Sequence, residues 1–312
     1  MSTGTVRAPA PTAGAPAQRA PTDRAKAERK LAFMLIAPAL IVMLAVTAWP
    51  IVNAFVLSLQ RADLRFPSAN KFIGFDNYGT VLGSSLWWQD VLHTVIITTV
   101  SVAIELVLGM LLALAMHRAI LARGAIRAIG LLPYGIVTVV AAFSWRYAWE
   151  LDSGWIPGLF GLKSDPLTST TGSYIAVIIT EVWKTTPFMA LLLLGGLALV
   201  PDELHEAARV DGATTWQRFW RITIPLMKPA ILVALLFRTL DAFRIFDTVF
   251  IFNAGAHGTE TVSILGYNQL LNRLNLGLGS TVSVLIFVLV AIIAFVYIKG
   301  FGAAATPGGR RT

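Results

Sequence analysis

The sequence contains no cysteine, and charged side chains make up only 13% of its 312 residues. The lack of cysteine excludes a disulfide, a thiol nucleophile and a thiolate metal site. Soluble domains carry about twice this proportion of charge. Together with the 56% of hydrophobic residues, the shortage of charge indicates a membrane protein.

Nucleotide-binding and signal motifs are also missing. No Gly-x-x-x-x-Gly-Lys-Ser/Thr stretch occurs, so the chain has no P-loop. ATP would therefore have to be hydrolysed by another chain. We expect this chain to be a non-catalytic subunit that binds no cofactor and no metal. Residues 1–25 are rich in Ala, Pro, Thr and Gly and lack the apolar core of a secretory signal. We expect a disordered basic tail over residues 1–30 and a second tail over 301–312.

Long apolar runs dominate the remaining sequence. A helix that crosses a bilayer takes about 20 apolar residues. The runs predict an all-α membrane domain over residues 31–300 with six transmembrane helices. These helices are expected at residues 31–59, 91–116, 126–149, 174–200, 226–252 and 281–298.

Basic residues gather in alternate connections between these runs. They are enriched in the N-terminal tail, after the second and fourth runs, and at the C-terminal end. Six spans place both termini on one side of the membrane, and the basic surplus places that side in the cytoplasm. The formal net charge of +8 therefore reflects membrane topology, and we expect no nucleic-acid partner.

The connection after the fourth run reads DELHEAARVDGATTWQRFWRITIPLMKP, from Asp202 to Pro229. Its opening acids and Gly212 predict a short helix that ends at the glycine. Thr214 and Gln217 have the spacing of a capping box, which predicts a second helix with an aromatic face. We expect both helices to lie across the membrane surface. The alanine-lined face of the first suits a groove in another protein, while packing on its own bundle is the alternative.

EAARVDGATTWQRFWRITIP resembles the EAA signature of permease subunits from bacterial ABC importers. The stretches FRTLDAFRIFDTVFIF (237–252) and FIGFDNYGTVL (72–82) are similar to the first-permease type of the sugar branch. That branch usually has Thr-Gly-Gly-Gly-Pro after the fifth span, where this chain reads NAGAHGTE. Within the branch, the chain most resembles permeases of actinobacterial trehalose-recycling importers. The residues that match the signature, with an acid before its glycine, are Glu206, Ala207, Ala208, Asp211, Gly212, Ile222 and Pro225.

The resemblance implies a type I ABC importer permease fold in the bacterial inner or plasma membrane. It implies a complex with a second permease subunit, two copies of an ATP-binding subunit and an extracytoplasmic sugar-binding (lipo)protein. ATP and Mg would then be bound by the ATPase, and the EAA loop at 201–225 would couple to it. The cargo would be a neutral disaccharide such as trehalose. Another oligosaccharide or glycerol phosphate is the alternative within the family, and a secondary transporter, which predicts internal repeats, is a remote one.

Ionisable side chains inside the apolar runs mark either pathways or internal pairs. Glu181 lies in the fourth run, with Lys184 three residues further on as its expected partner. Glu105 lies in the second run and has no obvious local partner, and Arg238 is one candidate. We interpret the charges of the fifth run as a structural ion ladder, with a gate or sugar contact as alternatives. That run holds four charges at i, i+3 spacing: Arg238, Asp241, Arg244 and Asp247.

Sugar sites usually combine aromatic faces with hydrogen-bonding groups. Both kinds of side chain occur near the outer ends of the third and fifth runs, although packing at the membrane edge would also explain each of them. The candidate substrate-pathway residues are Trp145, Tyr147, Trp149, Glu150, Asp247 and Asn253.

Overall fold

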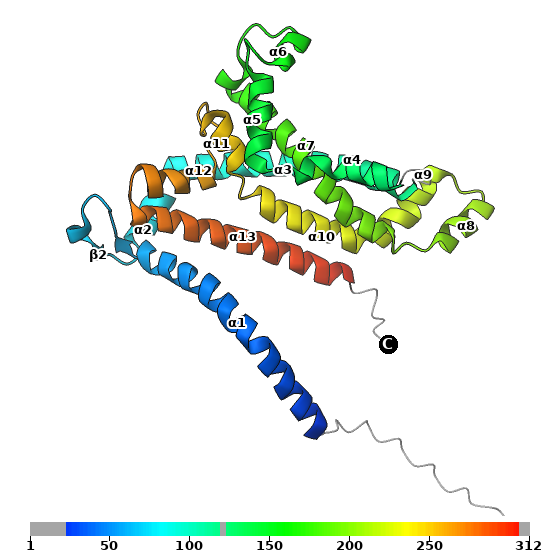
Figure 1. The fold of residues 1–312 in the computed structure, drawn as a ribbon, viewed down its shortest axis with the longest axis horizontal. Helices are drawn as coiled ribbons and strands as arrows, with labels where there is room; N and C mark the ends of the chain where they lie inside the picture. Colours follow the sequence, from blue (N-terminus) through cyan, green and yellow to red (C-terminus); the bar gives the residue numbers. More distant parts are fainter. Residues whose placement is uncertain (1–22, 119–122, 306–312) are drawn as a thin grey trace, which may run out of the picture. The chain divides into compact units, whose positions relative to one another are not determined.

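The computed structural model describes residues 23–118 and 123–305, and its elements are almost all helices. The chain divides into two compact units, Met1–Asn53 and Ala54–Thr312. The first unit contributes most of α1 (Asp23–Ser58), which stays helical through Pro38 and Pro50. The second unit contains all of the other elements and is drawn in Figure 1.

Within the described residues, five helices are long and apolar enough to cross a membrane, or six if one bent pair counts as a single span. The bent pair is α4 (Arg123–Gly135) and α5 (Thr138–Trp149), which meet at 91°. These findings confirm the predicted all-α membrane fold. The five uninterrupted candidates are α1, α3 (Ser85–Arg118), α7 (Thr170–Leu197), the continuous helix Thr215–Ala242, and α13 (Leu276–Ala305).

Shorter elements connect the spans. Between α1 and α3, β1 (Gln60–Arg61) pairs antiparallel with β2 (Lys71–Phe72). The helix Thr215–Ala242 consists of α9 (Thr215–Arg218), the π-helix η3 (Phe219–Thr223) and α10 (Ile224–Ala242). The other short elements are η1 (Pro67–Ala69), α2 (Asp76–Leu82), α6 (Trp155–Phe160), η2 (Pro166–Thr168), α8 (Asp202–Val210), α11 (Asp247–Asn253), α12 (Val262–Tyr267) and η4 (Asn268–Asn272).

Several predicted boundaries were wrong. The third run is broken after Gly135, and the fifth span ends at Ala242, with α11 as a separate helix. Helix α1 begins at Asp23 and α13 continues to Ala305, so parts of both expected tails are helical. The remainder of those tails, residues 1–22 and 306–312, lies outside the described residues.

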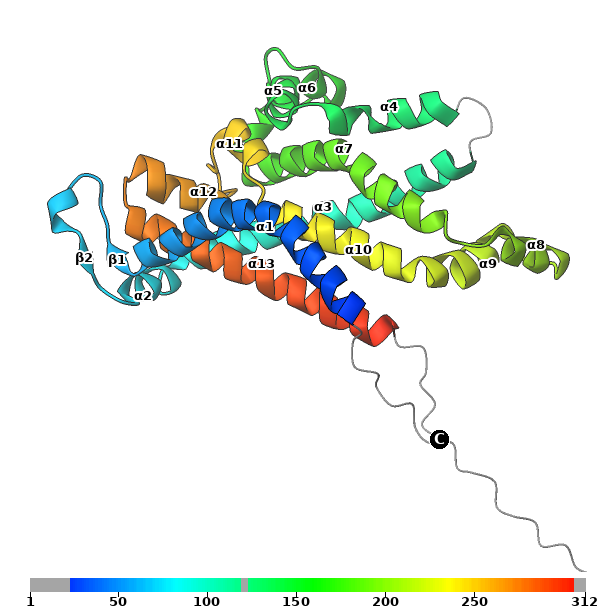
Figure 2. The same cartoon turned by 60° about the horizontal axis from the view of Figure 1, so that its bottom comes forward.

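Within the second unit, α3 and α10 pack against α7, and α13 packs against α10 (Figures 1 and 2). Small residues permit the close approach. A Cβ atom on Gly196 of α7 would lie 2.2 Å from Cβ of Ala230 on α10, and one on Gly109 of α3 would lie 2.7 Å from Cγ of Met189 on α7. Membrane helices commonly associate through such small residues. Lipid is as apolar as the side chains, so close packing rather than the hydrophobic effect drives their association.

A buried guanidinium links three of these helices. Arg238 of α10 is fully buried and donates two hydrogen bonds to Glu105 of α3, the Nη2–Oε1 distance being 2.9 Å. It also donates to Glu181 of α7 at 3.3 Å and to Asp241 one turn further along α10 at 2.8 Å. The sequence-based pairing of Glu105 with Arg238 is confirmed.

Two threonines complete this polar cluster, which we call the Arg238 network. Thr185 of α7 donates to Oε1 of Glu105 at 2.8 Å, and Thr248 of α11 donates to Glu181. A buried charge is stable only when it is paired and hydrogen-bonded. The network therefore fixes α3, α7, α10 and α11 in one arrangement.

Replacing Arg238 with leucine should destabilise the fold, because Glu105 and Glu181 would keep buried charges without their shared cation. Removal of one partner from a buried ion pair typically costs about 3 to 5 kcal/mol. We expect Arg238→Leu to lower the yield of folded protein and its unfolding temperature in detergent. Arg244→Leu is the matched control, because it removes the same charge from an exposed position six residues further along the chain. Wild-type thermal stability of Arg238→Leu would contradict the proposed role of the network.

Candidate functional site

A cavity of about 550 Å³ lies beside the Arg238 network, next to two breaks between helices. One interruption separates α4 from α5, and the other separates α10 from α11. Backbone that is not helical is tolerated at membrane depth only where protein or a water-filled cavity can satisfy its polar groups. The cavity is lined by Tyr134, Ile136, Val137, Thr138, Glu181, Lys184, Thr185, Asp241, Arg244, Ile245, Phe246, Asp247 and Thr248.

Lys184 of α7 satisfies the break between α4 and α5. Its Nζ donates to the carbonyl of Ile136 at 2.8 Å and lies 5.7 Å from the centre of the Tyr134 ring. The expected pairing of Lys184 with Glu181 is not formed, because Glu181 bonds to Arg238 and Thr248 instead. A cation on one helix thus holds an interrupted neighbour, and its ammonium group remains on the cavity wall.

The charges of the α10–α11 segment form only part of the expected ladder. Arg238 pairs with Asp241, whose side chain is 64% exposed. Arg244 donates from Nε to the carbonyl of Leu240 at 3.3 Å, and within the described residues neither it nor Asp247 belongs to an ion pair. Asp241, Arg244 and Asp247 all line the cavity, and Arg244 and Asp247 are available to a bound molecule or a partner.

Among the six predicted pathway residues, the structure places only Asp247 on the cavity wall. Trp145 packs edge-on against Trp183 with ring centres 5.6 Å apart, and Trp149 is buried in the core. Asn253 donates to Oγ of Ser173 at 3.1 Å. The other two residues, Tyr147 and Glu150, are exposed, and Glu150 accepts a hydrogen bond from Ser153.

Sequence reasoning missed the wall that the broken third span contributes. Tyr134 and Thr138 flank the break and line the cavity. The available signal was Pro133 with Gly135 in the middle of an apolar run. Such interruptions often mark binding sites in transporters, because they leave backbone groups free for a ligand or a neighbouring side chain.

The EAA-like stretch forms helix α8 and the turn after it. Glu206 and Ala207 are exposed, Ala208 is half-buried, and α8 buries none of its residues. Gly212 has φ +79° and donates to the carbonyl of Arg209, while Ala213 donates to that of Ala208 at 2.8 Å. These two bonds form a Schellman motif, for which glycine is the preferred residue. The predicted helix end at Gly212 is confirmed, and α8 presents an open face.

The second predicted helix is also present, but it does not lie apart from the fifth span. The capping box of Thr214 and Gln217 is formed, and Trp216, Phe219 and Trp220 pack together with ring centres 5.3 to 6.1 Å apart. The helix then continues through the π-helix η3 into α10. Pro225, expected at a turn into the span, lies within this continuous helix, two residues after the end of η3. Proline lacks an N–H and displaces the preceding turn, so a π-helix just before it relieves the conflict.

Comparison with known proteins agrees with this geometry. Residues 78–301 match the family described as "Binding-protein-dependent transport system inner membrane component". The "Trehalose transport system permease protein SugA" of Mycobacterium tuberculosis is 56% identical over 280 residues, which cover 90% of this chain and 91% of that protein. The "Trehalose/maltose transport system permease protein MalF" of Thermococcus litoralis is 39% identical, with 86% of this chain and 93% of that protein covered.

A solved structure supports the same fold. A chain of a bacterial ABC transporter involved in the import of the acidic polysaccharide alginate superposes with a TM-score of 0.74 at 22% identity. The match covers 91% of this chain and 100% of the other. The chain therefore belongs to the binding-protein-dependent transport system inner membrane components and is a permease of the ABC sugar-importer type.

Proposed function

We propose that this permease carries a neutral disaccharide of the trehalose class. Two observations together carry the proposal: the 56% identity to a trehalose permease, and a polar cavity where α4 meets α5 and α10 meets α11. The cavity wall offers hydroxyl, carboxylate and ammonium groups, which are suitable partners for sugar hydroxyls. In this proposal, a second permease supplies the opposite wall of the pathway.

The charge on the wall favours a neutral cargo over glycerol phosphate. The wall holds two cations, Lys184 and Arg244, against three carboxylates, Glu181, Asp241 and Asp247. Arg238, which lies behind the wall, bonds to Glu181 and Asp241. A phosphate ester would require cations that no carboxylate offsets. The cavity therefore suits an uncharged sugar, and another oligosaccharide is the second candidate.

Coupling to ATP hydrolysis would use α8. The chain has no P-loop, so ATP and Mg would be bound by two copies of a partner ATPase. The exposed face around Glu206 and Ala207 is shaped for a groove in that partner. Movement of α8 would pass through α9 into α10, along the continuous helix Thr215–Ala242. In this proposal, α8 and both termini lie in the cytoplasm. An extracytoplasmic binding protein would deliver the sugar on the other side.

Deleting the gene for this chain should abolish uptake of radiolabelled trehalose, with restoration by a plasmid copy. Uptake of glycerol 3-phosphate should not change, because the wall carries no surplus of cations. The measurement is initial uptake rate in the deletion strain, the complemented strain and the parent. Trehalose uptake at the parental rate in the deletion strain would reject trehalose as the cargo, and loss of glycerol 3-phosphate uptake alone would favour the phosphorylated alternative.

Replacement of Asp247 with leucine should reduce sugar uptake about tenfold or more, because a lost charged hydrogen bond typically removes 1.5 to roughly 3 kcal/mol. Glu150→Leu is the matched control, since that exposed carboxylate lies outside the cavity. Uptake should be compared at equal amounts of membrane-inserted protein. Equal losses in the two variants would contradict a pathway through this cavity.

Glu206→Ala and Gly212→Val should weaken assembly with the ATPase or uncouple hydrolysis from transport. The first removes an exposed charge from the docking face, and truncating one partner of an interfacial charge pair costs about 2 to 5 kcal/mol. The second places a β-branched residue at φ +79°, which only glycine adopts readily. Co-elution of the ATPase and sugar-stimulated hydrolysis in proteoliposomes are the measurements.

The control is Asp152→Ala, which removes an exposed carboxylate between α5 and α6, outside α8 and outside the cavity. Orientation can be checked in the same cells, because the chain has no cysteine of its own. A cysteine at Thr214 should be shielded from an impermeant reagent, and one at Ser169 should be labelled. Wild-type assembly and coupling in both variants would show that α8 is not the coupling helix.

A further inference from the structure

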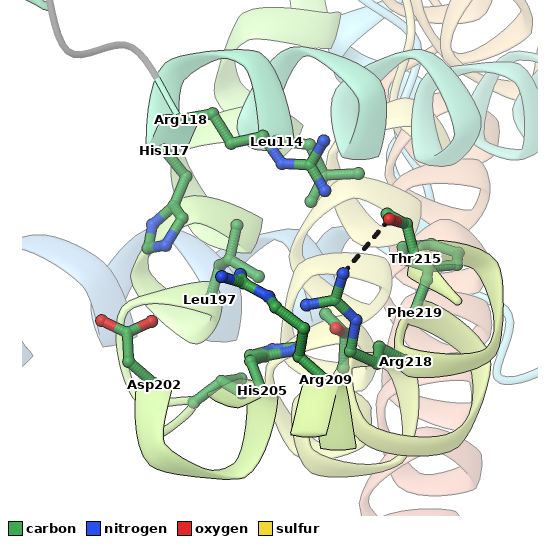
Figure 3. Close-up of a pocket in the computed structure, with 12 residues that line it drawn as sticks. Leu114, His117, Arg118, Leu197, Asp202, His205, Arg209, Thr215, Arg218 and Phe219 are labelled. Carbon is green, nitrogen blue, oxygen red and sulfur yellow. Dashed lines mark hydrogen bonds between the residues drawn. The ribbon is translucent and has the colours of Figure 1, made fainter. Parts of the chain in front are cut away.

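A second cavity of about 390 Å³ lies between the ends of α3 and α7 and the α8–α9 segment (Figure 3). We call it the basic cavity. It is separate from the cavity beside the Arg238 network and shares no residue with it. It is lined by Leu114, His117, Arg118, Leu197, Val200, Asp202, His205, Arg209, Thr215, Arg218, Phe219 and Thr223.

Three arginines from three helices surround this cavity. Arg118 ends α3, Arg209 lies in the last turn of α8 and Arg218 lies in α9, and their guanidinium groups point into the space between the helices (Figure 3). Two histidines, His117 and His205, lie on the same wall. Asp202 is the only acid in the lining, so cationic groups are in clear excess.

The arginines have few partners of their own. Arg218 donates from Nη2 to Oγ1 of Thr215 at 3.2 Å, and its Nε is buried without a hydrogen bond. Among the described residues, none of the three arginines forms an ion pair. Like charges gathered around a small space repel one another, and a buried unpaired donor lowers stability further. An anion in the cavity would relieve both effects.

We propose that the basic cavity binds a phosphate-bearing anion. Guanidinium groups are the preferred protein ligands of phosphate, because their planar N–H pairs match two oxygens at once. The arrangement favours the headgroup of an anionic phospholipid. Leu114, Leu197, Val200 and Phe219 form an apolar part of the same wall, at the ends of two candidate spans. Basic pockets between membrane helices commonly hold such headgroups.

The position of this site gives it a consequence for coupling. Its cations come from α3, α8 and α9, so a bound phosphate would connect α8 to the end of a transmembrane helix. A ligand stabilises the conformation to which it binds better, by the difference between its two affinities. Occupancy would therefore hold α8 in one position relative to the bundle. Anion binding depends on the basic cavity alone, whereas its consequence for coupling rests on the proposed role of α8. Neither depends on the identity of the cargo.

The test is anion binding by the whole transporter complex, isolated through a tag on this chain. The probes are phosphatidylglycerol and phosphatidylcholine in nanodiscs, and inorganic phosphate against chloride at equal ionic strength. The variants are Arg118→Gln and Arg218→Gln, which remove one cation from each side of the cavity. Arg221→Gln is the matched control, because that exposed arginine lies on η3 and does not line the cavity.

We expect the wild-type complex to retain phosphatidylglycerol in preference to phosphatidylcholine, as counted by mass spectrometry. Each cavity variant should weaken retention about fivefold, since one basic residue near an anionic surface contributes about 1 kcal/mol. The control should match wild type. Binding of inorganic phosphate that the cavity variants lose, without preference between the lipids, would support the site and identify a soluble anion as its ligand.

Two results would overturn the proposal. One is that the cavity variants bind both lipids and phosphate as the wild type does. The other is that they lose the ATPase from the complex while anion binding is unchanged, which would assign the arginines to an acidic surface of a protein partner. Co-elution of the complex and its unfolding temperature, measured for every variant, separate these results from simple misfolding.

Discussion

A guanidinium with no access to water is the constraint around which the second unit is arranged. Arg238 requires acids from other helices, and Glu105 and Glu181 are held where they can reach it. The requirement is reciprocal, because each acid would be uncompensated without the arginine. Thr248 extends the same set of bonds to α11, so the start of that short helix is positioned by the network. The larger cavity lies beside these fixed charges, so the network also holds the residues of its wall in place.

Much of this arrangement could be predicted from local sequence. Apolar runs identified the spans, and Gly212 with Thr214 and Gln217 identified the helix end and the cap after it. These features depend on residues that are a few positions apart, so they can be predicted without knowledge of the tertiary structure. The pairing of Glu105 with Arg238 was readable for another reason: membrane charges are scarce, so few partners are available.

The interruptions could not be predicted in the same way, since they depend on distant residues. The break after Gly135 is stabilised by Lys184, which is 48 positions from the carbonyl that it binds. The aromatic residues near the third span were equally misleading. The indole ring of Trp149 could in principle stack on a sugar, but this residue is buried by packing against neighbouring segments. An i, i+3 charge pattern predicted a bond between Glu181 and Lys184, whereas each of them bonds to a partner on another segment of the chain.

The uninterrupted helix from Thr215 to Ala242 has a mechanical consequence. At 1.5 Å per residue, about 35 Å separate the start of α9 from Arg238 along one rod. A helix of this kind tilts and rotates as one body and is hardly compressed along its axis. Displacement at one end therefore reaches the other end at nearly full amplitude. The π-helix η3 sets the phase of this rod, because one residue fewer there would turn everything before it by about 100°. The angular position of α9 relative to Arg238 is therefore encoded in five residues, Phe219–Thr223, rather than in any contact between the two ends.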